Sequence, residues 1–433
     1  MATRIHTDEL AEHVGRPVVL HGWLHRIRDL GGISFVLVRD SEGLAQVVLR
    51  SGEAAALVRE LNLESAIEIH GEVVANHQAP GGHELVNTSV RVVAPAAQPP
   101  PFDLFRPEIP AQLPTILDHA AVSLRHARSR EALRIAARSV EGFRNLLRAR
   151  GFTEIFTPKI VATSTESGAT VFPVDYFGRK AYLAQSPQLY KQVMVGVFER
   201  VFEVGSVFRA EPHDTTRHLT EYVSLDAEMG FIDDEHDVVS VLRGVIEGMV
   251  EAVRQDDRAV RITGAAIPQV PQSFPVVHFS DAQVAIRDAT GEDLSAQADL
   301  APAHERWLGE WAVRERESEF VVVTGYPTRK RPFYTHPDPD RPGFSRGFDL
   351  LFRGLEIVTG GQRLHRHEDY LRALSERGEP PEALAGYLEA FRHGIPPHGG
   401  FALGLERWVA QLVRAPNIRA VTAFPRDMSR LMP

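Results

Sequence analysis

The first hundred positions carry apolar residues in short, partly alternating runs. These runs are rich in β-branched and aromatic residues and are separated by glycine-containing turns, which is typical of half-buried strands. The runs occupy residues 18–27, 33–40, 44–50, 66–75 and 83–94, and residues 53–62 predict a short helix. Five strands with one helix between the third and the fourth predict an OB-type barrel, a frequent binder of single-stranded nucleic acid. Another small β-barrel would give the same pattern.

Prolines are dense directly after the last predicted strand. They stand at Pro95, Pro99, Pro100, Pro101, Pro107, Pro110 and Pro114. Proline lacks a backbone N–H and fixes φ, so the stretch predicts a hinge in place of a helix or a central strand. We therefore expect an OB-fold domain at 1–103, a proline-rich hinge at 104–124 and a second domain at 125–433.

The pattern changes to longer periods in the second domain. Helices are predicted at about 233–255 and 302–317, and strand-like runs at 320–327 and 347–361. A glycine-rich strand then runs into a helix at 398–413. Mixed helices and strands without an internal repeat predict an α+β domain that is large enough for a catalytic core.

The composition fits a globular protein and narrows its chemistry. The chain has 433 residues, 43% hydrophobic and 24% charged, which suits two or three domains. No apolar run is long enough for a membrane span, and the N-terminal residues lack the apolar run of a secretory signal. Without cysteine the chain has no disulfides or thiolate zinc sites, and we expect a cytoplasmic protein. The net charge of −9 gives no support for a nucleic-acid partner.

Arginine supplies nearly all of the positive charge. Lysine occurs only as Lys159, Lys180, Lys191 and Lys330. At these positions the chemistry of a site is a candidate reason for an ammonium in place of a guanidinium. Arginines cluster at Arg125, Arg128, Arg130, Arg134, Arg138, Arg144, Arg148 and Arg150. Their spacing fits the polar face of one amphipathic helix, and a contact with RNA phosphates is the alternative.

A polar loop between two predicted strands gathers candidate chemistry at 208–229. Arg209 ends the first strand, and Arg217 and His218 lie in the loop before the second. Two guanidinium groups and an imidazole directed at one place suit the distributed charge of a triphosphate. A surface hairpin with ion pairs would have the same pattern.

Two further segments are weak signals by themselves. In residues 150–161 a helix end is followed by a glycine, a strand and Pro158, a succession that is common between elements of secondary structure. In residues 398–413 the small residues would let a flat ligand lie against the backbone beneath Arg407, although glycine-rich strands often reflect close packing alone.

Together and in this order, the three segments resemble the signature motifs of class II aminoacyl-tRNA synthetases. The resemblance implies an antiparallel sheet flanked by helices, and the absence of a GxxxxGK phosphate loop agrees with it. It also implies a homodimer through the first segment, with Pro158 at the interface. The expected fold is therefore α+β, an N-terminal OB-fold barrel followed by a class II catalytic domain.

The segment YLAQSPQLYKQ at 182–192 resembles the substrate segment of aspartyl-tRNA synthetases. Lys191 and Arg363 would pair with the side-chain carboxylate of L-aspartate, since a buried anion is costly unless it is paired. Asparagine would leave both cations short of charge. Structural ion pairing of the two cations is the alternative. The resemblance implies an aspartate-binding set of Glu166, Gln188, Lys191, Arg209, Asp226, Thr359 and Arg363.

Two of these residues have particular roles by the same resemblance. Asp226 would orient the pocket. Glu166 would hold the α-ammonium from a mobile loop, or it would cap a helix in a Thr/Ser-x-x-Glu pattern.

The resemblance also implies an ATP site with Mg²⁺. Arg209, Glu356 and Arg407 are the expected catalytic residues. Asp349, Glu356 and Thr359 are the expected metal ligands, with Thr359 in a position that is often serine in the family. The expected ATP-binding set is Arg209, Glu211, Arg217, His218, Leu219, Tyr222, Glu356, Gly404, Leu405, Glu406 and Arg407.

The N-terminal barrel resembles the anticodon-binding domain of the same family. Phe35 would stack on an anticodon base, unless it belongs to the barrel core, and Arg28 and Gln46 are further candidate contacts. The chain lacks the large insertion of the bacterial-type aspartyl enzymes and so resembles the compact, archaeal-type subfamily. His25 and Pro80 stand where enzymes that charge only tRNA(Asp) tend to have tryptophan and lysine. His25 as a polar surface residue of no consequence is the alternative.

These residues predict a non-discriminating enzyme that makes Asp-tRNA(Asp) and Asp-tRNA(Asn), with a separate amidotransferase downstream of the latter. A discriminating aspartyl enzyme is the first alternative. An amide ligase of the same fold would lack the barrel, and a non-catalytic tRNA-binding paralogue would lack the catalytic charges. An asparaginyl enzyme is disfavoured by QSPQLYKQ.

Overall fold

The computed structural model describes residues 2–163, 170–212 and 214–432. The chain divides into two compact units, one up to residue 127 and one from residue 128 onward. None of the helices in the described ranges combines the length and the apolar character that crossing a lipid bilayer demands.

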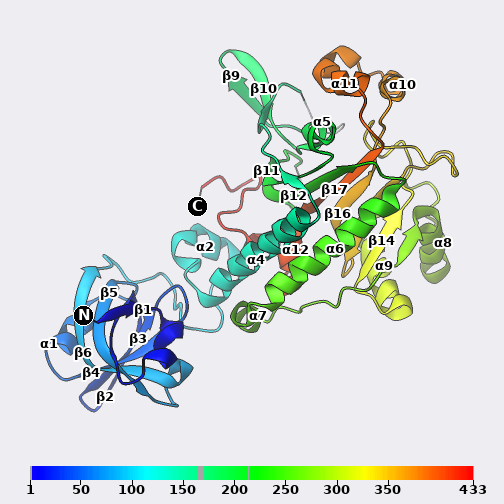
Figure 1. Ribbon diagram of the computed structural model, residues 1–433. Coiled ribbons are helices and arrows are strands. Elements are labelled where there is room, and N and C mark those ends of the chain that lie inside the picture. Colours follow the sequence, from blue (N-terminus) through cyan, green and yellow to red (C-terminus); the bar gives the residue numbers. More distant parts are fainter. Residues whose placement is uncertain (1, 164–169, 213, 433) are drawn as a thin grey trace. The chain divides into compact units, whose positions relative to one another are not determined.

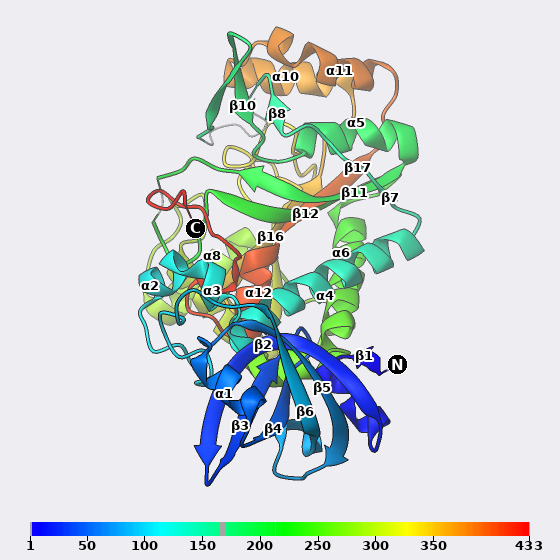
Figure 2. The same cartoon turned by 90° about the vertical axis from the view of Figure 1, so that its left-hand side faces the viewer.

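The first unit is built around a six-stranded sheet, of which the second to the sixth strand close into a barrel (Figure 2). Its strands are β1 (Thr3–Ile5), β2 (Pro17–Leu30), β3 (Ile33–Arg39), β4 (Leu44–Arg50), β5 (Ala66–Ala75) and β6 (His83–Ala94). Its helices are η1 (Thr7–His13), α1 (Glu53–Glu60), η2 (Pro80–Gly82), α2 (Leu113–Asp118) and α3 (Ala120–Ser123). The strand order is β1-β2-β3-β4-β6-β5, and β2 also pairs with β5, which closes the barrel. The predicted OB-fold, with one helix between its third and fourth principal strands, is confirmed.

The proline-rich stretch differs from its prediction at one end. We expected no helix there, yet α2 begins at Leu113 and contains Pro114 in its first turn. The first N–H groups of a helix have no partner within the helix, so proline is tolerated at that place.

The second unit is organised by an eight-stranded sheet (Figure 1). The strands of this unit are β7 (Thr153–Glu154), β8 (Ile160–Val161), β9 (Pro173–Tyr176), β10 (Arg179–Leu183), β11 (Arg200–Phe208), β12 (Glu221–Gly230), β13 (Val276–His278), β14 (Phe320–Thr324), β15 (Gly347–Phe352), β16 (Leu355–Gln362) and β17 (His398–Gly404). The large sheet has the order β13-β14-β15-β16-β17-β12-β11-β7 and is antiparallel between β14 and β11. The short strands β8, β10 and β9 form a separate sheet.

Helices cover both faces of the large sheet. They are α4 (Ala127–Ala149), α5 (Gln188–Phe198), α6 (Glu235–Arg254), α7 (Asp257–Thr263), α8 (Phe279–Thr290), α9 (Pro302–Arg316), α10 (His367–Arg377), η3 (Pro381–Leu384), α11 (Ala385–Arg392), α12 (Leu405–Val413) and η4 (Ile418–Val421). The predicted helices at 233–255 and 302–317 correspond to α6 and α9. The class II arrangement of an antiparallel sheet flanked by helices is confirmed.

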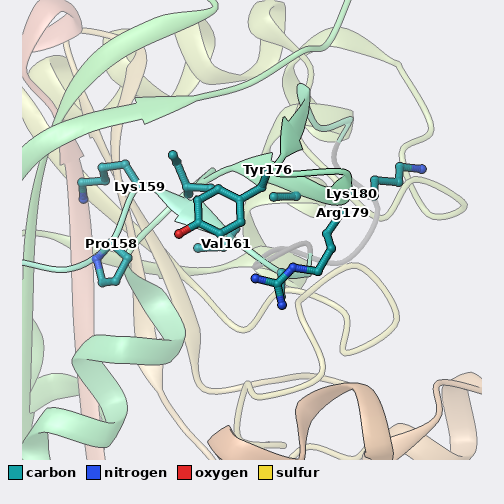
Figure 3. A pocket seen from close by; sticks show the side chains of 9 residues that line it. Pro158, Lys159, Val161, Tyr176, Arg179 and Lys180 are labelled. Carbon is teal, nitrogen blue, oxygen red and sulfur yellow. The ribbon is translucent and has the colours of Figure 1, made fainter.

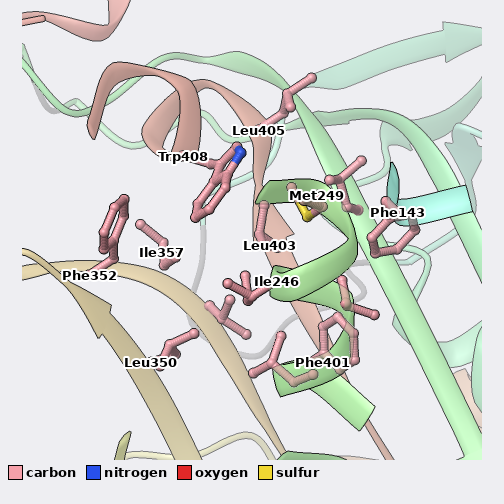
Figure 4. Close-up of a cluster of buried hydrophobic side chains, with 14 of the residues drawn as sticks. Phe143, Ile246, Met249, Leu350, Phe352, Ile357, Phe401, Leu403, Leu405 and Trp408 are labelled. Carbon is pink, nitrogen blue, oxygen red and sulfur yellow. The ribbon is translucent and has the colours of Figure 1, made fainter. Parts of the chain in front are cut away.

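The main hydrophobic core lies between one face of the sheet and α4, α6 and α12 (Figure 4). Phe143 of α4, Met249 of α6 and Trp408 of α12 pack there against Phe352 and Phe401 of the sheet. Successive strand residues point to opposite faces, so the neighbours of these core residues face away from α4 and α6.

Smaller apolar clusters cover parts of the opposite face. Helices α8 and α9 pack on Val321, Val323 and Leu351 at the β13 end, and α5, α10 and α11 form another cluster. The polar residues of β12, β15 and β16 lie on this face and line a cavity there.

The arginines of α4 engage acidic partners. Arg144 and Arg148 both pair with Glu154, and Arg138 pairs with Asp256. The predicted polar face of one amphipathic helix is what the structure shows for them, since α4 spans Ala127–Ala149 with its apolar residues in the core.

Candidate active site

A cavity of about 540 Å³ opens in the second unit, bordered by β12, β15, β16, β17 and the loop between β11 and β12. Fourteen of the residues proposed from the sequence line it: Gln188, Arg209, Glu211, Arg217, His218, Leu219, Tyr222, Asp349, Glu356, Thr359, Arg363, Gly404, Glu406 and Arg407. Residues more than two hundred positions apart in the chain therefore meet at one site.

The alternation of β12 explains why its polar residues reach the cavity side. Leu225 and Ala227 point into the main core. Tyr222 and Ser224, two residues apart, line the cavity, and Asp226 and Glu228 continue the same face deeper into the protein. The predicted hairpin of β11 and β12 pairs in register from Arg200↔Met229 to Phe208↔Glu221.

Arginines dominate the part of the cavity near the β11–β12 loop. The Arg209 guanidinium carbon lies 5.7 Å from the centre of the Tyr222 ring. Arg407 donates from Nη1 to the backbone oxygen of Glu356 at 2.9 Å and from Nε to that of Arg217 at 3.3 Å. His218 is held by a 2.6 Å hydrogen bond between its Nδ1 and the Thr215 hydroxyl. The two guanidinium groups suit the phosphates of a nucleotide, and the imidazole can add a hydrogen bond.

Asp349 and Glu356 form an acidic corner beside these arginines. Burial raises the pKa of Asp349, while Arg331, 2.9 Å from its Oδ2, opposes the rise. Its Oδ1 is buried and finds no hydrogen-bond partner among the described residues. Burial would likewise raise the pKa of Glu356, but Arg407 and the Thr359 hydroxyl hold it below its usual range. An unpaired carboxylate oxygen next to a second carboxylate fits a divalent cation with oxygen ligands.

Thr359 has a more specific position than its sequence suggested. Its hydroxyl donates to Glu356 Oε1 at 3.1 Å, so in this structure it orients that carboxylate. The oxygen of the hydroxyl keeps lone pairs that a cation could use.

The opposite part of the cavity contains a buried charge cluster centred on Arg363. Its Nε donates to Glu228 Oε1 at 3.0 Å, and its Nη2 donates to Gly400 O at 3.1 Å and Gln188 Oε1 at 3.3 Å. The guanidinium also lies over the Tyr334 ring at 5.4 Å. Planar recognition of a carboxylate is a property of such a fixed guanidinium.

Lys191 lies deeper than its proposed role suggests. It is 1% exposed, and neither Lys191 nor Asp226 is among the described residues that line the cavity. The ammonium donates to Asp226 Oδ1 and Phe401 O, both at 3.0 Å, and lies 3.3 Å from Glu228 Oε2. It thus forms the floor of the site behind Arg363.

Glu228 is a site residue that none of the sequence motifs indicated. Burial would raise its pKa, but Arg363 and Lys191 hold it below the usual range, so it remains a carboxylate between two cations. Two acids, Asp226 and Glu228, therefore balance the two cations of this cluster. Its position two residues after Asp226 on a strand was the available signal, because such residues share a face.

The glycine-rich strand β17 serves two purposes. A Cβ at Gly400 would lie 2.1 Å from both the Glu228 carboxylate and the backbone oxygen of Ala227, so glycine there makes room for the neighbouring strand and for its acid. At Gly404, which lines the cavity, a Cβ would meet no atom within 4 Å. Only this end of the strand fits the expectation of a backbone open to a flat ligand.

Two other residues proposed for ATP binding have different surroundings. Leu405 is buried in the main core and is absent from the described lining of the cavity. Glu406 lines the cavity, but its carboxylate accepts the backbone N–H of Val223 through both oxygens, at 3.1 and 3.2 Å. Burial raises the pKa of Glu406 to about 7. Glu166 lies outside the described residues.

In the barrel, Phe35 and Arg28 face outward as a cross-strand pair. They are register partners on β3 and β2, and the Arg28 guanidinium lies 5.7 Å from the Phe35 ring centre. Phe35 is half-buried and does not belong to the barrel core, so it has an accessible ring face. Gln46 is mostly buried and donates to Glu84 at 2.7 Å.

His25 lies inside a buried ionic network. A β-bulge between Leu24 and Arg26 turns its side chain away from solvent. Its Nδ1 is 3.1 Å from Glu64, a carboxylate that also binds Arg39 and Arg125 and whose pKa falls to about 2 despite burial. His25 is therefore not a surface residue. Pro80 is half-buried in the short turn η2.

A second hollow of about 560 Å³ lies beside Pro158 (Figure 3). Its wall consists of residues 158–162 and of the β9–β10 hairpin, with Tyr176, Arg179 and Lys180 around it. Two phenylalanines near this hollow in the sequence are strongly exposed: Phe156, two residues before Pro158, by 82%, and Phe177, in the turn of the hairpin, by 89%. Such exposed apolar surface is typical of protein contacts.

Comparison with known families agrees with this geometry. Residues 112–428 match the family "tRNA synthetases class II (D, K and N)", and residues 18–93 match "OB-fold nucleic acid binding domain". The chain is 47% identical over 431 residues to an aspartate--tRNA(Asp/Asn) ligase of Thermus thermophilus, covering 99% of this chain and 100% of that protein. A protein of the same name from Deinococcus radiodurans is 46% identical, with 99% and 98% covered.

Solved structures resemble the whole chain. An asparaginyl-tRNA synthetase from Pyrococcus horikoshii in complex with asparaginyl-adenylate superposes with a TM-score of 0.91 at 29% identity, covering 100% of both chains. A putative aspartyl-tRNA synthetase from Leishmania major has a TM-score of 0.88 at 26% identity, covering 100% of this chain and 95% of that one. The chain therefore belongs to the class II aminoacyl-tRNA synthetases, and within that class to the aspartyl-tRNA synthetase family.

Proposed function

We propose that the protein is an aspartate--tRNA ligase that activates L-aspartate with ATP and transfers it to both tRNA(Asp) and tRNA(Asn). The observation that carries the substrate is Arg363, which lines one end of the cavity, with the ammonium of Lys191 buried behind it. Relatives at 46–47% identity are named aspartate--tRNA(Asp/Asn) ligases, which supports the pair of tRNAs.

In the proposed first step the α-carboxylate of aspartate attacks the α-phosphorus of ATP. A new O–P bond forms as the bond to pyrophosphate breaks, giving aspartyl-adenylate. The described side chains contribute by position and charge, and none has to act as a nucleophile. Arg209 would neutralise the α-phosphate and the attacking carboxylate, while Arg217, His218 and Arg407 would bind the outer phosphates. Tyr222 would support the adenine.

Asp349 and Glu356 are the residues that would hold Mg²⁺, with Thr359 orienting or completing the set. The ion would neutralise charge on the phosphates and on the pyrophosphate that leaves. The unpaired Oδ1 of Asp349 supports this assignment.

The aspartate side chain would bind at the other end of the cavity. Arg363 would meet its carboxylate from the cavity wall, with Gln188 beside it. Lys191 would bind the same carboxylate from beneath the cavity, giving up one of its present hydrogen bonds to do so. Asp226 would keep the ammonium of Lys191 oriented. Glu166 would meet the α-ammonium.

In the second step the 3′-hydroxyl of the terminal tRNA adenosine would attack the carbonyl of the adenylate and release AMP. In the barrel, Phe35 would stack on an anticodon base and Arg28 would bind close to it. For His25 and Pro80 we propose an effect on the reading of the third anticodon base, and Gln46 is a further candidate contact to the anticodon. The burial of His25 beside Glu64 suggests that His25 acts by shaping its strand.

We further propose a homodimer that forms through the segment around Pro158. The exposed Phe156 and Phe177 and the hollow of Figure 3 support it, since an apolar surface of this kind would be covered in a dimer. Light scattering coupled to gel filtration would test it. If Asp-tRNA(Asn) is made, an amidotransferase would be needed to convert it to Asn-tRNA(Asn).

Two assays test the function. ATP–pyrophosphate exchange is expected with aspartate and not with asparagine. Charging with tRNA(Asp) and tRNA(Asn) transcripts is expected to give aspartylation of both. Strong rejection of the tRNA(Asn) transcript would instead establish a discriminating enzyme, and exchange without any charging would exclude the tRNA ligase.

A further inference from the structure

Helix α9 brings a buried carboxylate to the phosphate end of the cavity. The side chain of Glu305 is 6% exposed. Its Oε2 accepts a hydrogen bond from Arg217 Nη1 at 3.0 Å and another from the backbone N–H of Glu356 at 3.2 Å. A single oxygen atom therefore connects the β11–β12 loop with strand β16.

The position of this carboxylate is fixed by backbone contacts of α9. A Cβ at Gly309 would lie 2.4 Å from the backbone nitrogen of Gly354, in the turn between β15 and β16. A Cβ at Gly354, whose φ is +70°, would lie 2.7 Å from the Cα of Arg306. Only glycine fits on both sides of such a contact. The helix and the turn that precedes Glu356 therefore touch through their backbones.

A second bridge joins the same two residues. Arg407 donates to the backbone oxygens of both Arg217 and Glu356. Glu305 thus fixes the charged end of Arg217, and Arg407 fixes the main chain at both positions. A guanidinium that is paired with one carboxylate has a defined direction for its remaining N–H groups, and these are the groups that a phosphate would meet.

We infer that Glu305 is a positioning residue that sets the spacing between Arg217 and Glu356. The inference rests on the proposed function, in which the outer phosphates of ATP bind between the Arg217 cation and the ion held at Glu356. It also gives a role to α9, for which the sequence predicted a helix and no function.

Two substitutions separate the charge of Glu305 from its hydrogen bonds. Glu305→Gln keeps an oxygen that can accept from both Arg217 and the N–H of Glu356 but removes the negative charge that pairs with Arg217, whereas Glu305→Ala removes the charge and the acceptor. For Glu305→Ala we expect binding of a non-hydrolysable ATP analogue, measured with and without Mg²⁺, to weaken by about tenfold, as when a charged hydrogen bond is lost. Glu305→Gln should lie between this variant and the wild type. The KM for aspartate should change by less than about twofold, because the Arg363 cluster is made from other elements.

A matched control is available on the same helix. Glu310 is exposed, so Glu310→Gln should leave the binding of the ATP analogue and the KM for aspartate unchanged. If the Glu305 variants lower the melting temperature while analogue binding stays at the wild-type value, the residue is only structural and the inference is wrong.

A double-mutant cycle measures the coupling between Glu305 and Arg217 in analogue binding, which a purely structural role of Glu305 would not produce. If Glu305 acts through Arg217, Glu305→Gln should weaken analogue binding in the wild type and have little effect in an Arg217→Ala background. Equal effects in both backgrounds would overturn the inference. Wild-type exchange with aspartate is measured first. Its absence would refute the proposed function, whereas its presence together with additive effects would refute only the role of Glu305.

Discussion

Replacing Glu228 by glutamine tests the charge balance of the substrate cluster. The wild-type cluster contains two cations, Lys191 and Arg363, and two carboxylates, Asp226 and Glu228. Glu228→Gln preserves shape and removes one negative charge. It leaves the two buried cations with a single acid, and the new amide N–H₂ has to face one of them.

The expected loss follows from burial. Breaking a buried ion pair by removing one partner typically costs about 3–5 kcal/mol. For a unit of this size each kcal/mol lowers the melting temperature by about 2 °C, so the second unit should melt roughly 6–10 °C lower. The pKa of Glu228 in the folded protein is below its ordinary 4.5. Its stabilising effect is therefore complete at neutral pH and is lost as the pH falls below 4.5 toward the folded pKa.

Thermal unfolding, with and without a stable analogue of aspartyl-adenylate, would measure this effect. The analogue should raise the melting temperature of Glu228→Gln more than that of the wild type, because its side-chain carboxylate restores the missing charge. Glu247→Gln is the matched control, since it breaks an exposed ion pair with Arg243 and should change stability by at most about 1 kcal/mol. Equal melting temperatures for Glu228→Gln and the control would refute the reasoning.

Further outcomes are expected at other sites. Arg209→Ala should abolish ATP–pyrophosphate exchange with aspartate, and near-normal exchange would remove Arg209 from the proposed mechanism. Phe35→Ala should weaken tRNA binding by about 1–3 kcal/mol while adenylate formation stays normal; a loss of both would point to a folding defect. Burial raises the pKa of Glu406 to about 7, so the folded protein binds a proton there that the unfolded chain releases above 4.5, and this group makes stability fall as the pH rises from 4.5 to 7. Glu406→Gln should flatten that slope in thermal melts, whereas an unchanged slope would assign it to another group.

Strand periodicity made much of the fold and of the cavity predictable. The hairpin of β11 and β12 places Tyr222, Ser224 and Asp226 on one face because strand side chains alternate. The same rule would have added Glu228. The pattern also gave the barrel, in which the alternating apolar residues of β2 and β3 fill the core.

Other features depend on tertiary structure and leave little trace in a single sequence. The bulge after Leu24 reverses the alternation of β2 and buries His25. Glu305 reaches the site only because α9 packs against a turn some fifty residues further along the chain. Its residue type and helical position are those of many surface acids. The burial depth of Lys191 could not be predicted either, because the sequence is the same whether this lysine lines the cavity or lies beneath it.

The contact between Gly400 and Glu228 limits how the specificity of this site could be redesigned. A Cβ at position 400 would lie 2.1 Å from the Glu228 carboxylate and 2.1 Å from the backbone oxygen of Ala227, so position 400 has to remain glycine even where the acid on β12 is replaced. Selection for a neutral amide substrate would have to change the acid on β12 and its cation partners together. A single substitution of one of these charged residues would leave a buried charge without its partner. Libraries that vary one position at a time should therefore return mostly unstable proteins.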